Sequence, residues 1–366
     1  DAHIEILDDI NASSAKIDGV NFSLEREDDK FSLSLSYSEM QDALSSEEHV
    51  TITSKLELDL VKKNQAINID GTIEGINAAS LVKWGIPVEM LEGQKFYLNG
   101  AVKGQLDKEW RAEKITAEIS SDKGTLDLEG LLDTPLSFSN LSANIEYDKA
   151  AELIKIENTH LDLNGKTIAI SGTRDMSSDD KYFMVNMSVP TVTFDDIHAL
   201  WPENAKDTLF ADWMTNRLSK GIVKDLEVSI PLNVHDLADV PAERIKGKLS
   251  FTNLFADYRP PMLPVEGASG TATLENDTLD IQVASGNIST LKINKGSVNF
   301  TKLTHPKDIG DVKIVADLTG PIAAALTYIE KEPISLGEKI GLKPSEVKGT
   351  ADVNVVATFP GLADLL

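Results

Sequence analysis

The sequence contains no cysteine, which excludes disulfide bonds, thiol nucleophiles and cysteine-based zinc sites. No apolar run approaches the ~18 residues of a membrane-spanning helix, and no signal-peptide core is present. Aromatic residues make up only 6%, so an apolar core has to be built mainly from aliphatic side chains. These absences exclude cysteine chemistry and a spanning helix within this sequence.

Basic residues are scarce relative to acidic ones: 35 Lys and Arg stand against 59 Asp and Glu, for a net charge of −24. Nucleic-acid binding needs clustered Lys and Arg, so we predict no nucleic-acid partner. The same charge repels anionic membrane surfaces and favours solubility.

The usual signatures of catalysis and metal binding are also missing. The six histidines lie far apart at 3, 49, 160, 198, 235 and 305, and no nucleophile-elbow, phosphate-loop, zinc-helix or EF-hand motif occurs. Carboxylate pairs such as Asp28-Asp29 and Asp195-Asp196 are adjacent in sequence, so on a strand they would face opposite sides. We therefore predict a protein that is not an enzyme and needs no metal or cofactor.

Alternation of apolar and polar residues dominates what is present. "KFSLSLSYSEM", "KLELDLV" and "DTLDIQVASG" each place aliphatic or aromatic residues on one face, and about 18–22 such runs follow one another between Gly, Asp, Asn and Lys turns. Several runs end in glycine, as in "INIDG", "LDLEG" and "LDLNG". This degenerate repetition predicts an all-β fold in which one antiparallel sheet grows by adding hairpins.

Three segments interrupt the alternation, and we predict short helices near 78–92, 197–218 and 321–341. In the second segment Asp195 and Asp196 can cap the start, and a helix from about Asn204 places Leu209, Trp213 and Leu218 near one face. Such helices either close the end of a sheet and bury tryptophan or contact a ligand directly.

The apolar face of such a sheet must be hidden from water. About 20 strands at ~4.8 Å spacing would form a sheet roughly 90–100 Å long. Two sheets can pack as a sandwich, a barrel can close, or the sheet can curl into a trough that holds an apolar ligand. The alternation of apolar and polar residues alone does not distinguish a sandwich from a barrel or a trough.

Two motifs make the chain similar to the AsmA-like superfamily of bacterial envelope proteins, and most closely to its YhdP-type branch. The first motif is "LWPENAKDTLFADWMTNRLSKGIVKDLEVSIPL", in which the matching residues are Trp201, Pro202, Trp213, Leu218 and Gly221. The second is "GPIAAALTYIEKEPISLGEKIGLKPSEVKGTADVNVVATFP", in which the matching residues are Gly320, Pro321, Gly341, Leu342, Pro344, Gly349, Ala351, Phe359 and Pro360.

The resemblance implies a long, twisted, curled antiparallel sheet that forms an apolar groove and conducts phospholipid acyl chains between the inner and outer membranes. It implies a periplasmic location, tethered to the inner membrane through an anchor outside this sequence. Outer-membrane or periplasmic proteins are further candidate partners. Both ends, "DAHIEILDD" and "FPGLADLL", are interpreted as internal points of a longer protein. We predict a first groove segment over 1–194 and a second over 195–366, which together form one continuous elongated sheet.

The candidate lipid-binding residues are the apolar phases of the clearest strands: Phe31, Leu33, Leu35, Leu56, Leu58, Leu60, Leu126, Leu128, Ile281, Val283, Leu291 and Ile293. Each could instead belong to a filled core. The alternative functions are a structural or adhesive envelope protein built of β-sandwich repeats without a ligand, and a scaffold for outer-membrane assembly or polysaccharide.

Overall fold

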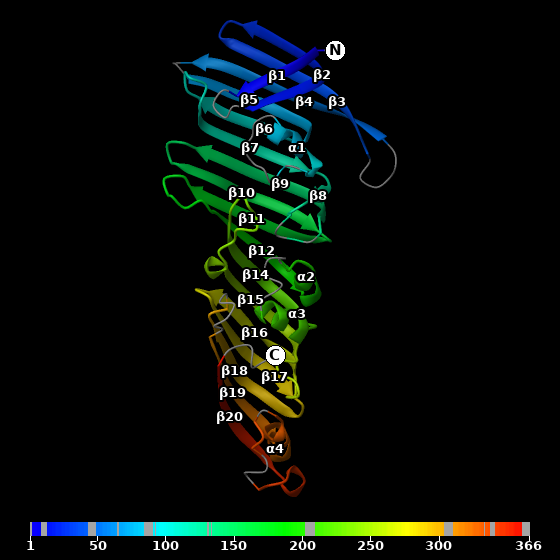
Figure 1. Ribbon diagram of the computed structural model, residues 1–366, viewed down its shortest axis with the longest axis vertical. Coiled ribbons are helices and arrows are strands. Elements are labelled where there is room, and N and C mark those ends of the chain that lie inside the picture. The colour runs from blue at the N-terminus through cyan, green and yellow to red at the C-terminus, as the bar shows by residue number, and fades with distance from the viewer. Residues whose placement is uncertain are drawn as a thin grey trace. The chain divides into compact units, whose positions relative to one another are not determined.

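The computed structural model is an all-β fold of twenty strands and four short α-helices within the residues it describes (Figure 1). The backbone is described at residues 2–8, 13–42, 49–63, 66–83, 91, 93–129, 132, 134–201, 209–303, 310–332, 334–336 and 341–360. Side chains are described over a narrower set: 21–36, 57–61, 66–81, 91, 93–129, 132, 134–201, 213–303, 310–332, 334–336 and 341–358. The predicted fold class, a large antiparallel sheet with a few short helices, is confirmed.

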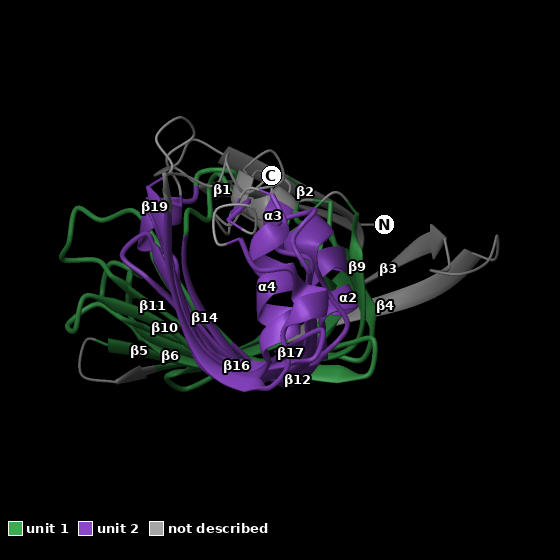
Figure 2. Ribbon diagram, turned by 90° about the horizontal axis from the view of Figure 1, so that it is seen from below, with its two compact units in different colours: residues 1–187, 232–239 green, residues 188–231, 240–366 purple. Residues whose placement is uncertain are grey.

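The chain divides into two compact units, one of residues 1–187 and 232–239, the other of residues 188–231 and 240–366 (Figure 2). The strands that begin in unit 1 are β1 Ala2–Asp8, β2 Ser13–Glu27, β3 Lys30–Asp42, β4 His49–Lys63, β5 Ala66–Asn77, β6 Lys95–Leu106, β7 Ala112–Ser121, β8 Gly124–Leu126, β9 Leu136–Asp148, β10 Leu153–Leu163, β11 Lys166–Asp175 and β12 Phe183–Thr193. Those that begin in unit 2 are β13 Leu218–Ser219, β14 Ile222–Leu232, β15 Lys246–Ala256, β16 Val265–Glu275, β17 Thr278–Ile288, β18 Leu291–Thr301, β19 Asp311–Pro321 and β20 Thr350–Pro360.

Unit 1 is an antiparallel meander. Each strand from β1 to β7 pairs with the next, β7 pairs with β9, and β9 continues to β10 and β11. The short strand β8 pairs with both β6 and β9. Helix α1, Ala78–Lys83, follows β5 directly and begins at a turn in which Asn77 Oδ1 accepts a hydrogen bond from Ala79 N at 2.9 Å.

Unit 2 repeats the meander from β14 to β20, again with antiparallel neighbours. Its sheet curves, and α2 Phe194–Ala199, α3 Leu209–Arg217 and α4 Ile322–Glu330 lie on the concave side of that curve (Figure 2). Two 3-10 turns, Ala242–Arg244 and Pro344–Glu346, complete the regular elements of the described part.

Helices occur in all three predicted segments, and α4 is shorter than expected. Within 78–92 the structure describes helix only at α1, and residues 84–90 and 92 lie outside the described set. The segment 197–218 contains the end of α2 and all of α3, and 202–208 again lie outside. Within 321–341, α4 ends at Glu330.

The cap of α2 also differs in detail from the expectation. Thr193 is the N-cap: its Oγ1 accepts from Asp196 N at 3.2 Å, and Asp196 Oδ2 accepts from Thr193 N at 2.8 Å. Asp196 therefore closes a capping box as its third helical residue instead of starting the helix. Gly221 has a left-handed φ of 80° and lies between β13 and β14.

Candidate functional site

Ladder register in unit 1 aligns apolar residues into rows that run across the strands. Directly paired residues lie on the same face of a sheet, so a chain of pairs from strand to strand defines each row. The Leu33 row consists of Leu24, Leu33, Leu58, Gly71, Val102, Ala117, Ile145, Ile156 and Gly172. The Ile69 row, one step along each strand, consists of Arg26, Phe31, Leu60, Ile69, Gly104, Ile115, Tyr147, Ile154 and Arg174.

These two rows are half-buried, whereas the opposite end of the same face is a packed core. In the described rows Leu33, Leu58 and Ile145 keep part of their surface exposed, and Leu24 is 56% exposed. At the other end of the strands Phe96, Leu98 and Phe138 are buried in a cluster with Leu161, Leu163 and Ala78 of α1. The face therefore changes along the strands from a filled core under α1 to apolar rows that are only partly covered.

Glycines in the rows make space for their large neighbours. A Cβ at Gly71 would overlap Leu58 Cδ2 and would lie 2.7 Å from Glu57 O. The Leu58 side chain thus spreads over the position that Gly71 leaves empty. The packing of the row therefore requires glycine at position 71. At this point the surface of the row consists of a bulky side chain that covers the backbone of the neighbouring strand.

Unit 2 has the same arrangement. The Ile281 row consists of Leu249, Ala272, Ile281, Val298, Ile314 and Ala357, and the neighbouring Val283 row consists of Phe251, Gly270, Val283, Gly296, Ala316 and Val355. Every member of the Ile281 row is half-buried. The row is therefore an apolar strip with one residue from each of six strands and only partial cover.

Helices cover the two ends of the strands on either side of the Ile281 row, and Val283, Ala316 and Val355 of the Val283 row pack on the cluster under α4. At one end α3 packs Trp213 on Phe300, with ring centroids 5.0 Å apart, and Phe300 is 2% exposed. At the other end Ala324, Ala325 and Tyr328 of α4 pack on a buried cluster of Ile288, Leu291, Ile293 and Leu318. Helix α3, which carries Trp213, therefore covers the end of the sheet. This is one of the two roles, beside direct ligand contact, that the sequence analysis left open for it.

The candidate residues fall into three groups in the structure. Phe31, Leu33, Leu58 and Leu60 lie in the two rows of unit 1 and Ile281 and Val283 in those of unit 2, all half-buried. Leu35 is buried, Leu126 packs on the core under α1, and Leu128 is half-buried after β8. Leu291 and Ile293 are 1% and 5% exposed under α4. The Leu56 side chain lies outside the described set.

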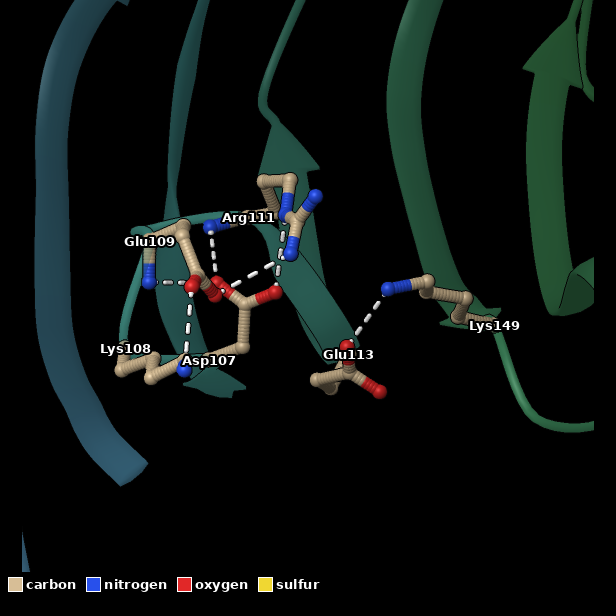
Figure 3. Close-up of polar contacts among 6 residues, drawn as sticks. All are labelled: Asp107, Lys108, Glu109, Arg111, Glu113 and Lys149. Atoms are coloured by element: carbon tan, nitrogen blue, oxygen red, sulfur yellow. Dashed lines mark hydrogen bonds and ion pairs between the residues drawn. The ribbon is translucent and has the colours of Figure 1, made fainter. Parts of the chain in front are cut away.

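The clearest cluster of charged side chains closes the turn between β6 and β7 (Figure 3). Asp107 Oδ1 accepts from the backbone N–H groups of Glu109 and Arg111, both at 2.9 Å, and its Oδ2 lies 2.8 Å from Arg111 Nε. The Arg111 backbone N–H and then its guanidinium lower the pKa of Asp107. Lys149 pairs with Glu113 at 2.6 Å. These charges are mutually satisfied and hold a hairpin end, so they do not resemble an acid–base pair awaiting a substrate.

Two further polar contacts are structural. Asp239 accepts from Lys181, from Tyr182 at 2.9 Å and from Asn233 at 3.0 Å, and the Lys181 ammonium first, then Asn233 and Tyr182, lowers its pKa to about 2. The hydroxyls of Tyr258 and Tyr328 lie 2.5 Å apart, and burial raises the pKa of both. Tyr328 thereby ties α4 to the loop after β15.

In the part of the chain that the structure describes, no group of three His, Asp or Glu residues is placed to hold a metal ion. No described helix is both long and apolar enough to span a membrane.

Together these features define a class: antiparallel β-sheet proteins with apolar rows left half-buried and short helices over the strand ends. The family described as YhdP protein matches residues 88–362, well over half of the chain. The chain therefore belongs to the YhdP family of the AsmA-like superfamily, as the two motifs indicated. No match was found among curated proteins or among solved structures. Family membership associates the chain with lipid transport and the bacterial envelope.

Sequence reasoning missed much of the rows between β6 and β11, including Val102, Ala117, Ile145 and Ile156. Small residues and glycines dilute the alternation there, so these strands look less apolar than "KFSLSLSY". The strand register was the missing information, because it aligns a strand whose alternation is weak with neighbouring strands whose alternation is strong. Arg174 could have been found, because "TIAISGTRD" places it two residues after Gly172 on the face of Ile168 and Ile170.

Proposed function

We propose that this protein binds phospholipid acyl chains on its half-buried apolar rows and, in the complete envelope protein, conducts them between the inner and outer membranes. The observation that carries the proposal is the contrast within one sheet face. Ile281 and Val298 are half-buried beside strand ends where Phe300 and Leu291 are fully packed. Each buried CH₂ is worth about 0.8 kcal/mol, so covering these rows with hydrocarbon would be favourable.

A row of apolar residues is better suited than a closed pocket to binding an acyl chain. It offers one apolar contact per strand at ~4.8 Å spacing and no described polar group among the members of the Ile281 row. A tail can therefore bind without a specific headgroup contact and exchange similar contacts as it moves. The protein would act without catalysis, in the periplasm, tethered to the inner membrane and with envelope proteins as partners.

The experiment is site-specific photocrosslinking combined with native mass spectrometry. The photoreactive residue benzoylphenylalanine replaces Leu58 or Ile281 on the rows, or their outward neighbours Glu57 or Gln282 as matched controls. We expect phospholipid adducts at the two row positions and none at the controls, together with co-purified phospholipid at a defined ratio.

The rival reading is a structural or adhesive β-sandwich repeat, in which a second layer would cover the rows. Its signature would be a protein free of lipid, no uptake of a fluorescent phospholipid, and no adduct at Leu58 or Ile281. That combination would refute lipid binding.

A further inference from the structure

Two arginines lie on the apolar face of unit 1, at opposite ends of the Ile69 row: Arg26, which is exposed and donates to Asp28 O, and Arg174, which is half-buried. Strand β11 alternates so that Ile168, Ile170, Gly172 and Arg174 share a face. The register pairs Arg174 with Ile154, which itself pairs with Tyr147 on β9. Arg174 therefore stands at the end of the Ile69 row, in line with aliphatic residues instead of among the charges of the opposite face.

No protein group in the described part of the chain neutralises Arg174. Its Nε is buried without a hydrogen-bond partner, and no described carboxylate forms an ion pair with it. The neighbouring Asp175 faces the other way and accepts from Ser177 N at 2.9 Å. Acids are not lacking, since the chain has 59 of them for 35 basic residues. Arg111, by contrast, is held by both Asp107 and Glu109.

A second donor stands close by on the same row. Tyr147 is half-buried, and its hydroxyl makes no hydrogen bond to the described residues. Two inter-strand spacings separate it from Arg174, or roughly 9.6 Å between Cα atoms at ~4.8 Å per spacing, with Ile154 of β10 between them. Two side chains of this length can approach one anion from either side of an isoleucine.

We propose that Arg174, assisted by Tyr147, binds the phosphate of a phospholipid whose acyl chains lie on the Leu33 and Ile69 rows. The inference rests on the proposed function and adds a headgroup site to it. A guanidinium binds a phosphate through two parallel hydrogen bonds, and this interaction strengthens where water is partly excluded. Hydrocarbon contacts and an unpaired cation lie in one row, which fits an amphiphile better than a free anion.

The test measures binding of three probes to the whole chain: palmitoyl-oleoyl phosphatidylglycerol, the diacylglycerol with the same tails, and inorganic phosphate. The variants are Arg174→Gln and Arg174→Lys. Lys155→Gln is the matched control, because it removes the same charge from the opposite face of β10, paired with Thr173. Circular dichroism melting establishes that each variant is folded.

We expect Arg174→Gln to weaken phosphatidylglycerol binding about tenfold, the loss of one charged hydrogen-bonded contact, and to leave diacylglycerol binding unchanged. Arg174→Lys should recover part of the loss, and Lys155→Gln should bind as the parent does. Equal binding of phosphatidylglycerol by the parent and Arg174→Gln would overturn this inference alone. Binding of inorganic phosphate as tight as that of the lipid would replace it with a free-anion site. Failure of the parent to bind either lipid would overturn the proposed function as well.

Discussion

Alanine substitution at Ile281 and at Leu291 should distinguish a partly open apolar row from a filled core. The two residues lie on adjacent strands, β17 and β18, and each substitution removes three carbon atoms. Leu291 is 1% exposed in the cluster under α4, whereas Ile281 is half-buried. The two substitutions therefore remove the same number of carbon atoms from sites that differ in burial.

The expected magnitudes follow from burial. Three fully buried carbons are worth roughly 2.4 kcal/mol at ~0.8 kcal/mol each, so a half-buried isoleucine should lose about 1 kcal/mol. No closed cavity forms where solvent reaches the site. Leu291→Ala loses the full transfer free energy and leaves a cavity, so the free energy of unfolding should fall by about 3–4 kcal/mol, within the usual range of about 2–5 kcal/mol.

Urea unfolding followed by far-ultraviolet circular dichroism measures both values, provided that the m-values agree. Gln282→Ala, on the opposite face beside Ile281, is the control and should change stability by less than about 0.5 kcal/mol. If Ile281→Ala costs as much as Leu291→Ala, Ile281 is part of a closed core and the reasoning about open rows is wrong.

Two further predictions concern the polar contacts. Tyr328→Phe should destabilise unit 2 by about 1–3 kcal/mol by leaving the Tyr258 hydroxyl buried and unpaired, while the double variant with Tyr258→Phe should recover most of the loss; chemical denaturation of the three variants checks this. Burial, and then Tyr328, raises the pKa of Tyr258. The contribution of Tyr258 to stability is therefore present below about pH 10 and is lost as pH rises further. The stability of the double variant should consequently fall less steeply with rising pH in alkali. The pKa of Asp239 is lowered to about 2, so its contribution is present above about pH 4 and is lost as pH falls toward 2. Asp239→Asn should therefore flatten the acid-side fall in melting temperature, and an unchanged fall would show that the contact with Lys181 adds nothing.

The fold could be predicted because strand alternation is local. Residues such as Leu33 and Leu35 define their face from the sequence alone, and the three helix-bearing interruptions were equally visible. The length of the helix in the third segment was overestimated because apolar residues such as Leu336 continue past Glu330, although α4 ends there. Burial could not be predicted in the same way: Ile281 and Leu291 have the same local pattern, and only α4 packing on β18 separates them.

The spacing of the rows bears on how a bound tail could move. Each row contributes one residue per strand, so displacing a tail by ~4.8 Å brings it to the next residue of the row. In the Val283 row these steps alternate between bulky and bare positions, Val283 beside Gly270 and Gly296. In the Ile281 row every step meets a side chain. An acyl chain that lies on both rows would lose contacts with one row while it kept its contacts with the other. At each point along the path it would therefore lose only part of its total contact with the protein. Substituting Gly296 by valine would make the two rows alike and should slow lipid exchange while binding persists, provided that the strand tolerates the added side chain, whose Cβ would lie 3.4 Å from Val315 O.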